Sequence, residues 1–305
     1  MRKWIRGLLF SRPASLILME IIADITAMQD RCFAERGAGR RIAFVPTMGF
    51  LHEGHLSLLR EGRKCGDLLV LSIFVNPTQF GQGEDLDRYP RDLARDEQLA
   101  RECGVDALFS PDAAAIYPND YMTFVNIEGP LTTTLEGVSR PTHFRGVATV
   151  VAKLFIIVQP HVALFGCKDF QQLAVVRRMT ADLNLPVEII GMPIVREADG
   201  LAMSSRNVYL SAAERQQALS LSQALGRGRQ LAADGVRQAG EVLTALRTMI
   251  EAQPAARIDY LRICHRATLQ EQERIDADSV LLLAVFIGKT RLIDNGFRLD
   301  QAMTC

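Results

Sequence analysis

The sequence lacks the features that would assign its 305 residues to a membrane-spanning, disordered or nucleic-acid-binding class. It contains no apolar run of the ~20 residues that a membrane-spanning helix needs. With 48% hydrophobic and 23% charged residues, it does not have the composition of a disordered chain. Its 35 basic and 35 acidic residues cancel, so the basic excess of many nucleic-acid-binding domains is missing. We therefore expect a globular protein with no membrane and no nucleic acid as partner.

Paired cysteines and a secretion signal are also missing. Near the N-terminus, Arg2, Lys3 and Arg6 precede a short apolar stretch, but Ser11-Arg12-Pro13 ends it far below the length of a signal peptide. The cysteines show none of the close spacings that disulfide frameworks or metal sites use. We expect reduced thiols in a cytoplasmic protein. The six cysteines are Cys32, Cys65, Cys103, Cys167, Cys264 and Cys305.

Alternating strand and helix patterns run through the first two thirds of the chain. A near-continuous apolar run such as 68–75 is typical of a parallel strand covered by helices on both faces. We predict an α/β fold with a Rossmann-like parallel sheet. The strands are expected at 42–45, 68–75, 105–110, 161–165 and 187–190, and the helices at about 22–36, from 55 onward, 91–102, 147–158 and 166–184.

The last third of the chain predicts a smaller C-terminal α/β lid domain. Pro193 marks a hinge, and Ser211 and Glu214 form a capping box that begins a helix. Alanine-rich helices continue to about residue 252, and strands are expected near 258–264 and 280–287. We find no second set of convergent polar groups in this part of the sequence.

The most informative stretch runs from Ile42 to His55, where an apolar strand is followed by a Pro/Gly turn and a helix start. An open parallel sheet binds ligands at such loops, because the free N–H groups and dipole of the helix N-terminus attract anions. Gly49 and Gly54 let the backbone approach a bulky ligand, and His52 and His55 can donate hydrogen bonds to phosphate oxygens. These parts together predict a cradle for a nucleoside triphosphate.

The histidine pair has two other interpretations. A histidine near an apolar helix face is more often a packing residue, and the spacing of His52 and His55 also occurs in zinc sites. A zinc site needs a third protein ligand, and neither a His-Glu-x-x-His helix nor a paired Cys-x-x-Cys is present. The position of the pair at a strand-to-helix junction favours ligand binding over packing.

Polar groups follow two later strands as well. Gln79 lies just after strand 68–75, and its amide suits a hydroxyl or a carboxylate, although ordinary turn chemistry explains it equally well. Gly166-Cys-Lys-Asp169 repeats the strand, glycine, polar, helix arrangement. Lys168 provides a charge that can balance a triphosphate or a leaving pyrophosphate. Asp169 can either cap the helix or hold a ribose hydroxyl.

Some polar residues have ordinary explanations. The loop at 81–87 either closes over a site or merely joins two elements. Asp96 lies on a charged helix face, and a role in placing magnesium is only a hypothesis. His143 and Arg145 are expected to decorate a helix start, and we do not assign either as a catalyst.

The motifs also carry a family resemblance. His52-Glu-Gly-His55 resembles the His-x-Gly-His element of the nucleotidylyltransferase and class I aminoacyl-tRNA synthetase superfamily, and the segment 196–207 resembles its mobile Lys-Met-Ser-Lys-Ser loop. Within that superfamily, residues 19–297 are similar to the pantothenate synthetase, or pantoate–β-alanine ligase, family. The strings that carry this similarity are 46–55, 72–80, 165–172 and 202–207.

The resemblance implies a ligase that condenses pantoate with β-alanine to pantothenate. Such an enzyme uses ATP, forms a pantoyl adenylate, and releases pyrophosphate and then AMP. Mg²⁺ is expected to enter with the triphosphate, with its protein ligands unassigned, and a homodimer is expected by analogy. Because the resemblance starts near Met19, we expect residues 1–18 to be an upstream extension or a disordered tail. The sheet domain is then 19–192, and the lid domain is 193–305.

The resemblance also assigns residues to roles. Gln79 and Gln172 are expected to bind pantoate, and one branch of that site is expected to take β-alanine. Cys167 stands where the family often has glutamate or glutamine, so its side chain is expected to do no chemistry. The expected catalytic residues are His55, a candidate proton donor with a pKa near ~6.5, His52, Lys168 and Arg206. The expected ATP-binding residues are Met48, Gly49, Phe50, Leu51, His52, Glu53, Gly54, His55, Gly166, Cys167, Lys168, Asp169, Val195, Met203, Ser204, Ser205 and Arg206.

Two rival functions share part of this pattern. A nucleotidylyltransferase acting on a phosphorylated small-molecule acceptor would keep both ATP motifs, but should carry basic groups where Gln79 and Gln172 stand. A non-catalytic nucleotide sensor could keep the cradle, but would have no reason to keep Lys168 and the 203–206 loop beside an amide-lined pocket.

Overall fold

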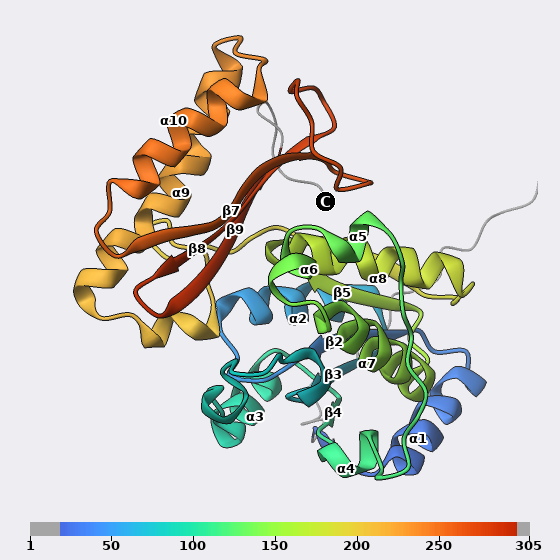
Figure 1. Ribbon diagram of the computed structural model, residues 1–305. Coiled ribbons are helices and arrows are strands. Elements are labelled where there is room, and N and C mark those ends of the chain that lie inside the picture. The colour runs from blue at the N-terminus through green and yellow to red at the C-terminus, as the bar shows by residue number, and fades with distance from the viewer. Residues whose placement is uncertain (1–18, 298–305) are drawn as a thin grey trace, which may run out of the picture.

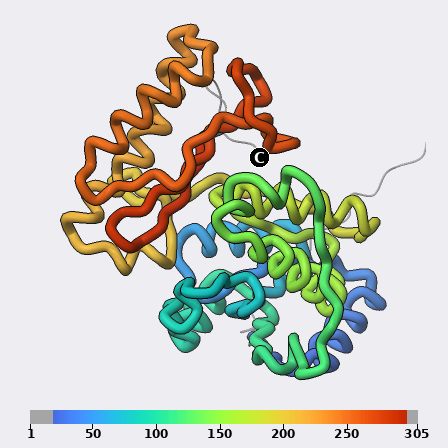
Figure 2. The backbone as a smooth tube through the Cα atoms, viewed as in Figure 1, coloured from blue at the N-terminus to red at the C-terminus, as the bar shows by residue number. Residues whose placement is uncertain are grey.

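The computed structural model describes residues 19–297, so the predicted extension at 1–18 lies outside the described residues. Two sheets organise this part of the chain (Figure 1). A six-stranded parallel sheet belongs to the N-terminal part, and a three-stranded antiparallel sheet belongs to the C-terminal part. Figure 2 shows the C-terminal part, in orange and red, above the N-terminal part, in blue to yellow-green.

The parallel sheet has the strand order β1-β4-β3-β2-β5-β6. Its helices are α1 (Ile25–Gly37), α2 (Glu53–Cys65), α3 (Leu93–Glu102), α7 (His143–Val158) and α8 (Phe170–Asp182). Shorter helical turns include α4 (Ala113–Ile116), α5 (Pro130–Thr133) and α6 (Glu136–Ser139). The strands are β1 (Glu20–Ile22), β2 (Ile42–Thr47), β3 (Leu68–Ile73), β4 (Ala107–Phe109), β5 (Val162–Gly166) and β6 (Glu188–Met192).

Both faces of this sheet are buried, because successive side chains along a strand point to opposite faces. In β2, Ile42 and Phe44 join a core with α1, α7 and α8. Ala43 and Val45, from the same strand, join a second core with α2 and α3. The apolar runs of the sequence therefore become strands that lie between two helical layers. This arrangement confirms the predicted Rossmann-like fold.

The strand order brings two distant loops together. From β2 the chain builds one half of the sheet through β3 and β4, and later builds the other half through β5 and β6. The order reverses between β2 and β5, which are paired through Ala43 and Val162. At such a switch point the loops after the two strands diverge and leave a crevice for a ligand. The loop 48–52 and the turn 167–169 flank this crevice.

The C-terminal part is a sheet with helices on one face, as Figure 1 shows. It contains α9 (Ala212–Ala233), α10 (Ala239–Glu251), β7 (Ala256–His265), β8 (Ser279–Ile287) and β9 (Thr290–Phe297). Leucine, isoleucine, valine and alanine side chains of both helices pack against the strands in one core. The predicted smaller C-terminal domain is confirmed as a fold, while its boundary at residue 193 stays a prediction.

Several predicted elements differ from the structure. Strand β1 was not predicted, because three residues are too few to show a period, and α1 begins only after the N-cap Asp24. Strand β9 was also missed, because Asp294 and Asn295 interrupt its apolar pattern although both are buried. Helix α7 begins at His143, four residues before the predicted start at Val147. No helix in the stretch 19–297 is long and apolar enough to cross a membrane.

Candidate active site

The loop after β2 has a fixed backbone shape. Gly49 adopts a φ of +83°, and a Cβ there would meet Ile73 at 2.9 Å, so only glycine fits without strain. Asp96 of α3, which is buried, accepts the backbone N–H of Phe50 at 2.6 Å and that of Leu51 at 2.7 Å. Burial raises the pKa of the Asp96 carboxyl. Both carboxylate oxygens of Asp96 hold this loop, so Asp96 shapes its backbone, while a role in placing magnesium stays a hypothesis.

The two histidines of the motif hold each other at the start of α2. His52 is the N-cap, and its Nδ1 accepts the backbone N–H of Gly54 at 3.1 Å. The Nδ1 of His55 accepts the backbone N–H of His52 at 3.3 Å, and the ring centroids are 4.0 Å apart. Since each Nδ1 is an acceptor, the neutral rings carry their protons on Nε2. Each ring therefore retains one N–H donor that a phosphate oxygen can accept.

Both imidazoles are neutral near pH 7. Burial, and then the charge of Lys168, lower the pKa of His52 to about 4. Burial, then His52 and Lys168, hold the pKa of His55 well below its ordinary value. The expectation of a pKa near ~6.5 is therefore wrong, because that value belongs to a solvated imidazole. The rings donate hydrogen bonds at neutral pH without carrying a positive charge.

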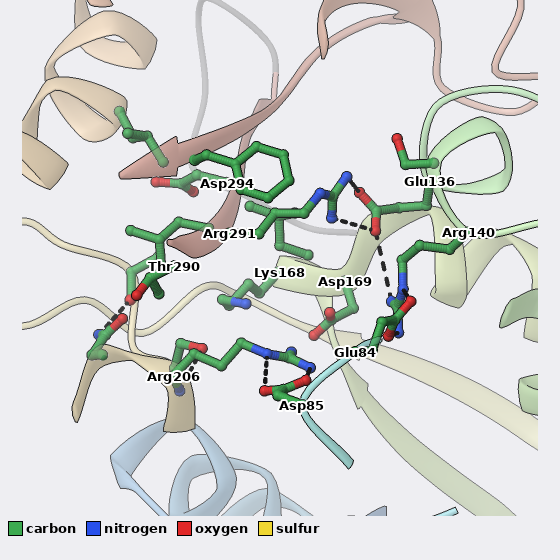
Figure 3. Close-up of a pocket in the computed structure, with 18 of the residues that line it drawn as sticks. Glu84, Asp85, Glu136, Arg140, Lys168, Asp169, Arg206, Thr290, Arg291 and Asp294 are labelled. Atoms are coloured by element: carbon green, nitrogen blue, oxygen red, sulfur yellow. Dashed lines mark hydrogen bonds and ion pairs between the residues drawn. The ribbon is translucent and has the colours of Figure 1, made fainter. Parts of the chain in front are cut away.

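The turn after β5 presents a lysine and an aspartate to the same crevice. Lys168 and Asp169 lie in a short 3₁₀ turn, η3 (Cys167–Asp169), directly before α8. Asp169 is the N-cap residue of α8, but its side chain makes no capping hydrogen bond within the described part of the chain. The helix-capping alternative is therefore not realised. The carboxylate of Asp169 instead lines the cavity beside Lys168 (Figure 3).

An amide pocket follows β3. Gln79 lies in a 3₁₀ turn, η1 (Pro77–Gln79), and its Oε1 accepts a hydrogen bond of 3.1 Å from the Nδ2 of Asn76. Its Nε2 contacts the sulfur of Met48 at 2.9 Å. Asn76 is almost fully buried, and its Nδ2 also donates to the backbone oxygen of Gly146 at 3.1 Å. Gln79 is therefore held by specific contacts beyond those of an ordinary turn.

Residues at the start of α7 and just before it hold the backbone of this amide pocket. The backbone oxygen of Gln79 lies 3.0 Å from the Nδ1 of His143 and accepts a hydrogen bond of 3.1 Å from Arg140. A Cβ at Gly146 would lie 2.4 Å from the backbone oxygen of Thr78, so this glycine allows the helix to pack directly on the turn. Burial, and then Arg140, lower the pKa of His143 to about 4. His143 therefore supports the predicted substrate residue as a neutral group.

Two neighbouring cavities collect most of the predicted residues. An inner cavity of about 210 Å³ lies where β2, β3 and β5 end, and an outer cavity of about 870 Å³ extends to the C-terminal sheet. Met48, Gln79, Lys168, Asp169, Gln172, Ser204 and Arg206 line both of them. The inner cavity is also lined by His52, Gly54, His55, Gly166, Val195, Met203 and Ser205. The segments near 50, 168 and 205 thus meet at one site.

Five predicted ATP-binding residues do not line either cavity. Leu51 is buried in the core, and Glu53 pairs with Arg60 on the surface. Cys167 is the first residue of the turn η3 that carries Lys168, and it is fully buried. Gly49 and Phe50 are the remaining two, and they form the loop that Asp96 holds. A motif match selects consecutive residues, whereas only some side chains of a loop can face its ligand.

Ion pairs surround the outer cavity, as Figure 3 shows. Arg206 makes two hydrogen bonds of 2.8 Å to Asp85 of the 81–87 loop. Arg140 binds Glu84 of the same loop at 2.7 Å. Arg291 of β9 binds Glu136 of α6 at 2.7 Å, which links the C-terminal sheet to the N-terminal part. The 81–87 loop therefore contributes to the wall of the cavity and does more than join two elements.

Sequence reasoning missed several of these residues. Asn76 follows β3 directly, so its position at a strand end was a usable signal. Tyr89 lines the inner cavity, with its ring 5.7 Å from the Arg206 guanidinium, and no pattern near it indicates this. Glu136 and Arg291 lie 155 positions apart in the chain, so only the fold brings them together. Over residues 19–297, no three His, Cys, Asp or Glu side chains cluster as a metal site.

Comparison with known proteins gives a consistent result. The family described as Pantoate-beta-alanine ligase matches residues 20–297. The pantothenate synthetase of Syntrophotalea carbinolica is 64% identical over 283 residues, which cover 93% of this chain and 100% of that protein. The pantothenate synthetase of Syntrophus aciditrophicus is 59% identical over 277 residues, covering 91% and 96% of the two chains.

Solved structures agree with the fold. The crystal structure of pantothenate synthetase from Thermus thermophilus aligns with a TM-score of 0.87 and 48% identity, covering 91% of this chain and 99% of that one. The pantoate-beta-alanine ligase from Francisella tularensis, complexed with beta-gamma ATP and beta-alanine, aligns with a TM-score of 0.77 and 31% identity. That alignment covers 93% of this chain and 99% of the other.

Proposed function

This chain belongs to the pantoate-beta-alanine ligase family, and we propose that it makes pantothenate from pantoate and β-alanine through a pantoyl-adenylate intermediate. It is a ligase that forms an amide bond and uses ATP as a substrate. One observation carries the proposed mechanism. Three segments line the same inner cavity: residues 48–55, which we call the histidine loop, the turn that carries Lys168, and residues 203–206. Gln79 and Gln172, which suit a small hydroxy acid, line this cavity as well.

In the first half-reaction, a carboxylate oxygen of pantoate attacks the α-phosphorus of ATP. The bond from that phosphorus to the bridging oxygen breaks, and pyrophosphate leaves with the electron pair. The Nε2–H groups of His52 and His55 donate to phosphate oxygens, and Lys168 balances the charge that develops on the leaving group. Ser204 and Arg206 bind the outer phosphates, for which an arginine fork and a hydroxyl are suited.

In the second half-reaction, the amine of β-alanine attacks the acyl carbon of the adenylate. The carbon–oxygen bond to AMP breaks, AMP leaves, and the nitrogen loses a proton as the amide forms. Gln79 and Gln172 hold the hydroxyl groups of the pantoyl part, so the acyl carbon stays in place between the two steps. The fixed contacts of Gln79 with Asn76 and Met48 support this positioning role.

The small acid is expected in the inner part of the site. Gln79 lies deep, at 8% exposure, and apolar side chains of α7, including Val147 and Val151, face the same inner cavity. An amide pair beside an apolar wall suits a hydroxy acid that carries methyl groups. Basic groups for an acceptor phosphate would favour a nucleotidylyltransferase instead, but amides occupy this part of the cavity.

We further propose that Mg²⁺ enters with the triphosphate. The Asp169 carboxylate makes no capping hydrogen bond among the described residues and lines both cavities, so it is a candidate outer contact for a cation held mainly by phosphate oxygens and water. Bound Mg²⁺ would neutralise part of the triphosphate charge. We also propose a cytoplasmic location. The free thiols of Cys32, Cys65, Cys103 and Cys264 support it, whereas Cys167 is disulfide-bonded, which does not fit the expectation that all the cysteines are reduced.

We propose a homodimer by analogy, and residues 193–305 as the lid domain. Met122 at 86% exposure and Phe124 at 39% are exposed large apolar side chains near each other in the sequence, so they are candidates for a subunit contact. Sedimentation equilibrium of the wild type and of a Met122→Ser variant tests this. A monomeric wild type would contradict it.

A partial-reaction assay tests the function directly. Enzyme with Mg²⁺ and ATP should release pyrophosphate when pantoate is added, and AMP only when β-alanine follows. A nucleotidylyltransferase would release pyrophosphate with a phosphorylated acceptor and not with pantoate. A nucleotide sensor would bind ATP and release neither product.

A further inference from the structure

A side chain of the C-terminal sheet holds the turn that carries Lys168. The Nδ2 of Asn295, on β9, donates to the backbone oxygen of Cys167 at 2.9 Å and to that of Lys168 at 2.8 Å. Asn295 is 2% exposed, so these bonds are shielded from water. They join residues 127 and 128 positions apart in the chain. The lysine of the site is therefore held from the opposite part of the molecule.

The side-chain amide of Asn295 acts as a hydrogen-bond donor but not as an acceptor among the described residues. Its Nδ2 has two acceptors, whereas its Oδ1 is buried without a hydrogen-bond partner among the described residues. A buried polar atom without a partner lowers stability. An aliphatic side chain would avoid this loss at that position. The residue therefore serves as a donor to the Lys168 turn and is poorly explained as a packing residue.

The neighbouring residue binds a second segment of the site. Asp294, also buried, accepts hydrogen bonds from Arg196 at 2.7 and 3.0 Å. Arg196 forms an antiparallel bridge with Ala202, directly before the segment 203–206. The same Asp294 carboxylate accepts the backbone N–H of Asn295 at 2.8 Å. Strand β9 thus contacts two of the three segments that surround the proposed phosphate site.

We propose that Asn295 is a positioning residue that acts through Lys168, so that the C-terminal sheet fixes the lysine for the phosphates of ATP. This inference deepens the proposed function and rests on it for the role of Lys168. Asn295 holds the main chain of the turn, and the side chain of Lys168 extends from that turn into both cavities. A small shift of the turn moves the ammonium group, and errors of about 1 Å in such a group can cost 10²-fold in rate.

A double-mutant cycle on ATP binding tests the inference. The four proteins are wild type, Asn295→Ala, Lys168→Ala and the double variant, titrated with Mg²⁺ and ATP by calorimetry. If Asn295 acts through Lys168, Asn295→Ala weakens binding about tenfold in the wild type but less than about twofold beside Lys168→Ala. If the loss of ATP affinity in the double variant equals the product of the losses in the two single variants, the inference fails. Unchanged ATP binding in Asn295→Ala would overturn it as well.

A matched control separates positioning from loosening of the sheet. Val285 of β8 is fully buried in the C-terminal core and lines neither cavity, so Val285→Ala loosens the same sheet without touching the turn. We expect Val285→Ala to lower the melting temperature and leave ATP binding unchanged. If it weakens ATP binding as much as Asn295→Ala does, the effect belongs to the sheet as a whole and the inference fails.

Two further measurements keep the result decisive. If Asn295→Ala does not fold by circular dichroism, the cycle is repeated with Asn295→Ser, which keeps one donor, and the same criterion of non-additivity applies. In the partial reaction, we expect Asn295→Ala to lower kcat for pyrophosphate release while KM for pantoate stays unchanged. A wild type that releases no pyrophosphate with pantoate would contradict the proposed function, whereas the ATP-binding cycle would still decide the role of Asn295.

Discussion

The histidine loop and the charged rim of the outer cavity are held by different kinds of contact. The rim consists of the ion pairs Arg206–Asp85, Arg140–Glu84 and Arg291–Glu136. In the histidine loop, backbone N–H groups donate to a buried side chain, as in the bonds from Phe50 and Leu51 to Asp96 of α3. In the rim, long charged side chains bind one another across different segments, as Arg206 binds Asp85. The loop can keep these bonds when a ligand enters. If Arg206 binds the triphosphate as we propose, the rim exchanges its pair with Asp85 for a contact with phosphate.

This difference separates preorganised groups from groups that rearrange. Preorganised donors contribute most to catalysis, because they need no reorganisation during the reaction. The Arg206–Asp85 pair of the rim is partly exposed, and such a pair contributes little to stability and can exchange at small cost. We therefore expect changes in the histidine loop and at Lys168 to have larger effects than changes in the rim. The following experiments, from the largest expected effect to the smallest, test this ranking.

The largest effect is expected at His55 and Lys168. Replacing either residue by Ala removes a donor or a charge aimed at the phosphates, and should lower pantoate-dependent pyrophosphate release by about 10²–10³-fold. Rapid-quench measurement of adenylate formation checks this. His265→Ala, at the end of β7, and Lys64→Ala, on the surface of α2, are the matched controls and should retain the wild-type rate. Adenylate formation near the wild-type rate in both site variants would refute their assignment.

A pH effect on stability is expected at His143, which joins the amide pocket to the rim. Burial and Arg140 lower its native pKa to about 4, while an unfolded histidine titrates near ~6.5. Between these values the unfolded state binds more protons, so stability falls as pH drops from ~6.5 to ~4, by about 3 kcal/mol from this group. His52 and His55 add losses of the same sign.

Urea unfolding at several pH values measures this effect. His143→Gln retains an amide N–H that can donate to the backbone oxygen of Gln79, but cannot titrate. Its stability should therefore fall less steeply with decreasing pH than that of the wild type. Parallel pH curves for the two proteins would show that His143 is not held neutral in the native state.

A medium effect is expected at Asp96. Asp96→Asn keeps the shape of the side chain but replaces one accepting oxygen by an NH₂ group that faces a backbone N–H. This change should lower the free energy of unfolding by about 1–3 kcal/mol. It should also weaken ATP binding, because the histidine loop loses its support. Glu97→Gln, on the same helix, removes only a surface pair with Arg101 and serves as control. Equal stability of both variants in urea would mean that the loop does not depend on Asp96.

The smallest effect is expected in the rim. Burial alone would raise the pKa of the Asp85 carboxyl, but hydrogen bonds and the charge of Arg206 outweigh it and lower that pKa. Asp85→Asn frees Arg206 for the triphosphate, so ATP binding should tighten by no more than about fivefold, or ~1 kcal/mol. Calorimetry checks this, with Asp182→Asn, which breaks a surface pair with Arg178, as control. A loss of ATP binding above tenfold would place Asp85 among the preorganised groups.

The same comparison explains what the sequence could predict. The histidine loop was predictable, because a strand, a glycine turn and a helix start are local patterns, and Gly49 and His52 have local reasons for their conformations. The parallel sheet was predictable because its strands are short continuous apolar runs. The sequence places Asp96 on a charged helix face, where an exposed side chain is expected. Its burial and its support of the histidine loop were not predictable, because they depend on how α3 packs against the loop.

The rim and the C-terminal contacts depend on the fold. Arg291 and Glu136, or Asn295 and Lys168, are each more than a hundred positions apart, and no local period links them. Strand β9 was missed for the same reason, because Asp294 and Asn295 look like turn residues until their distant partners are known. The lowered histidine pKa values also required the structure, because burial is their largest cause.

The most direct test of the whole account is a crystal structure of the protein with pantoate and α,β-methylene ATP. We predict that the phosphates lie within hydrogen-bond distance of the Nε2 atoms of His52 and His55 and of the Nζ of Lys168, with pantoate beside Gln79. Triphosphate density on another surface, or pantoate away from the two glutamines, would contradict the claim that one cavity holds both substrates.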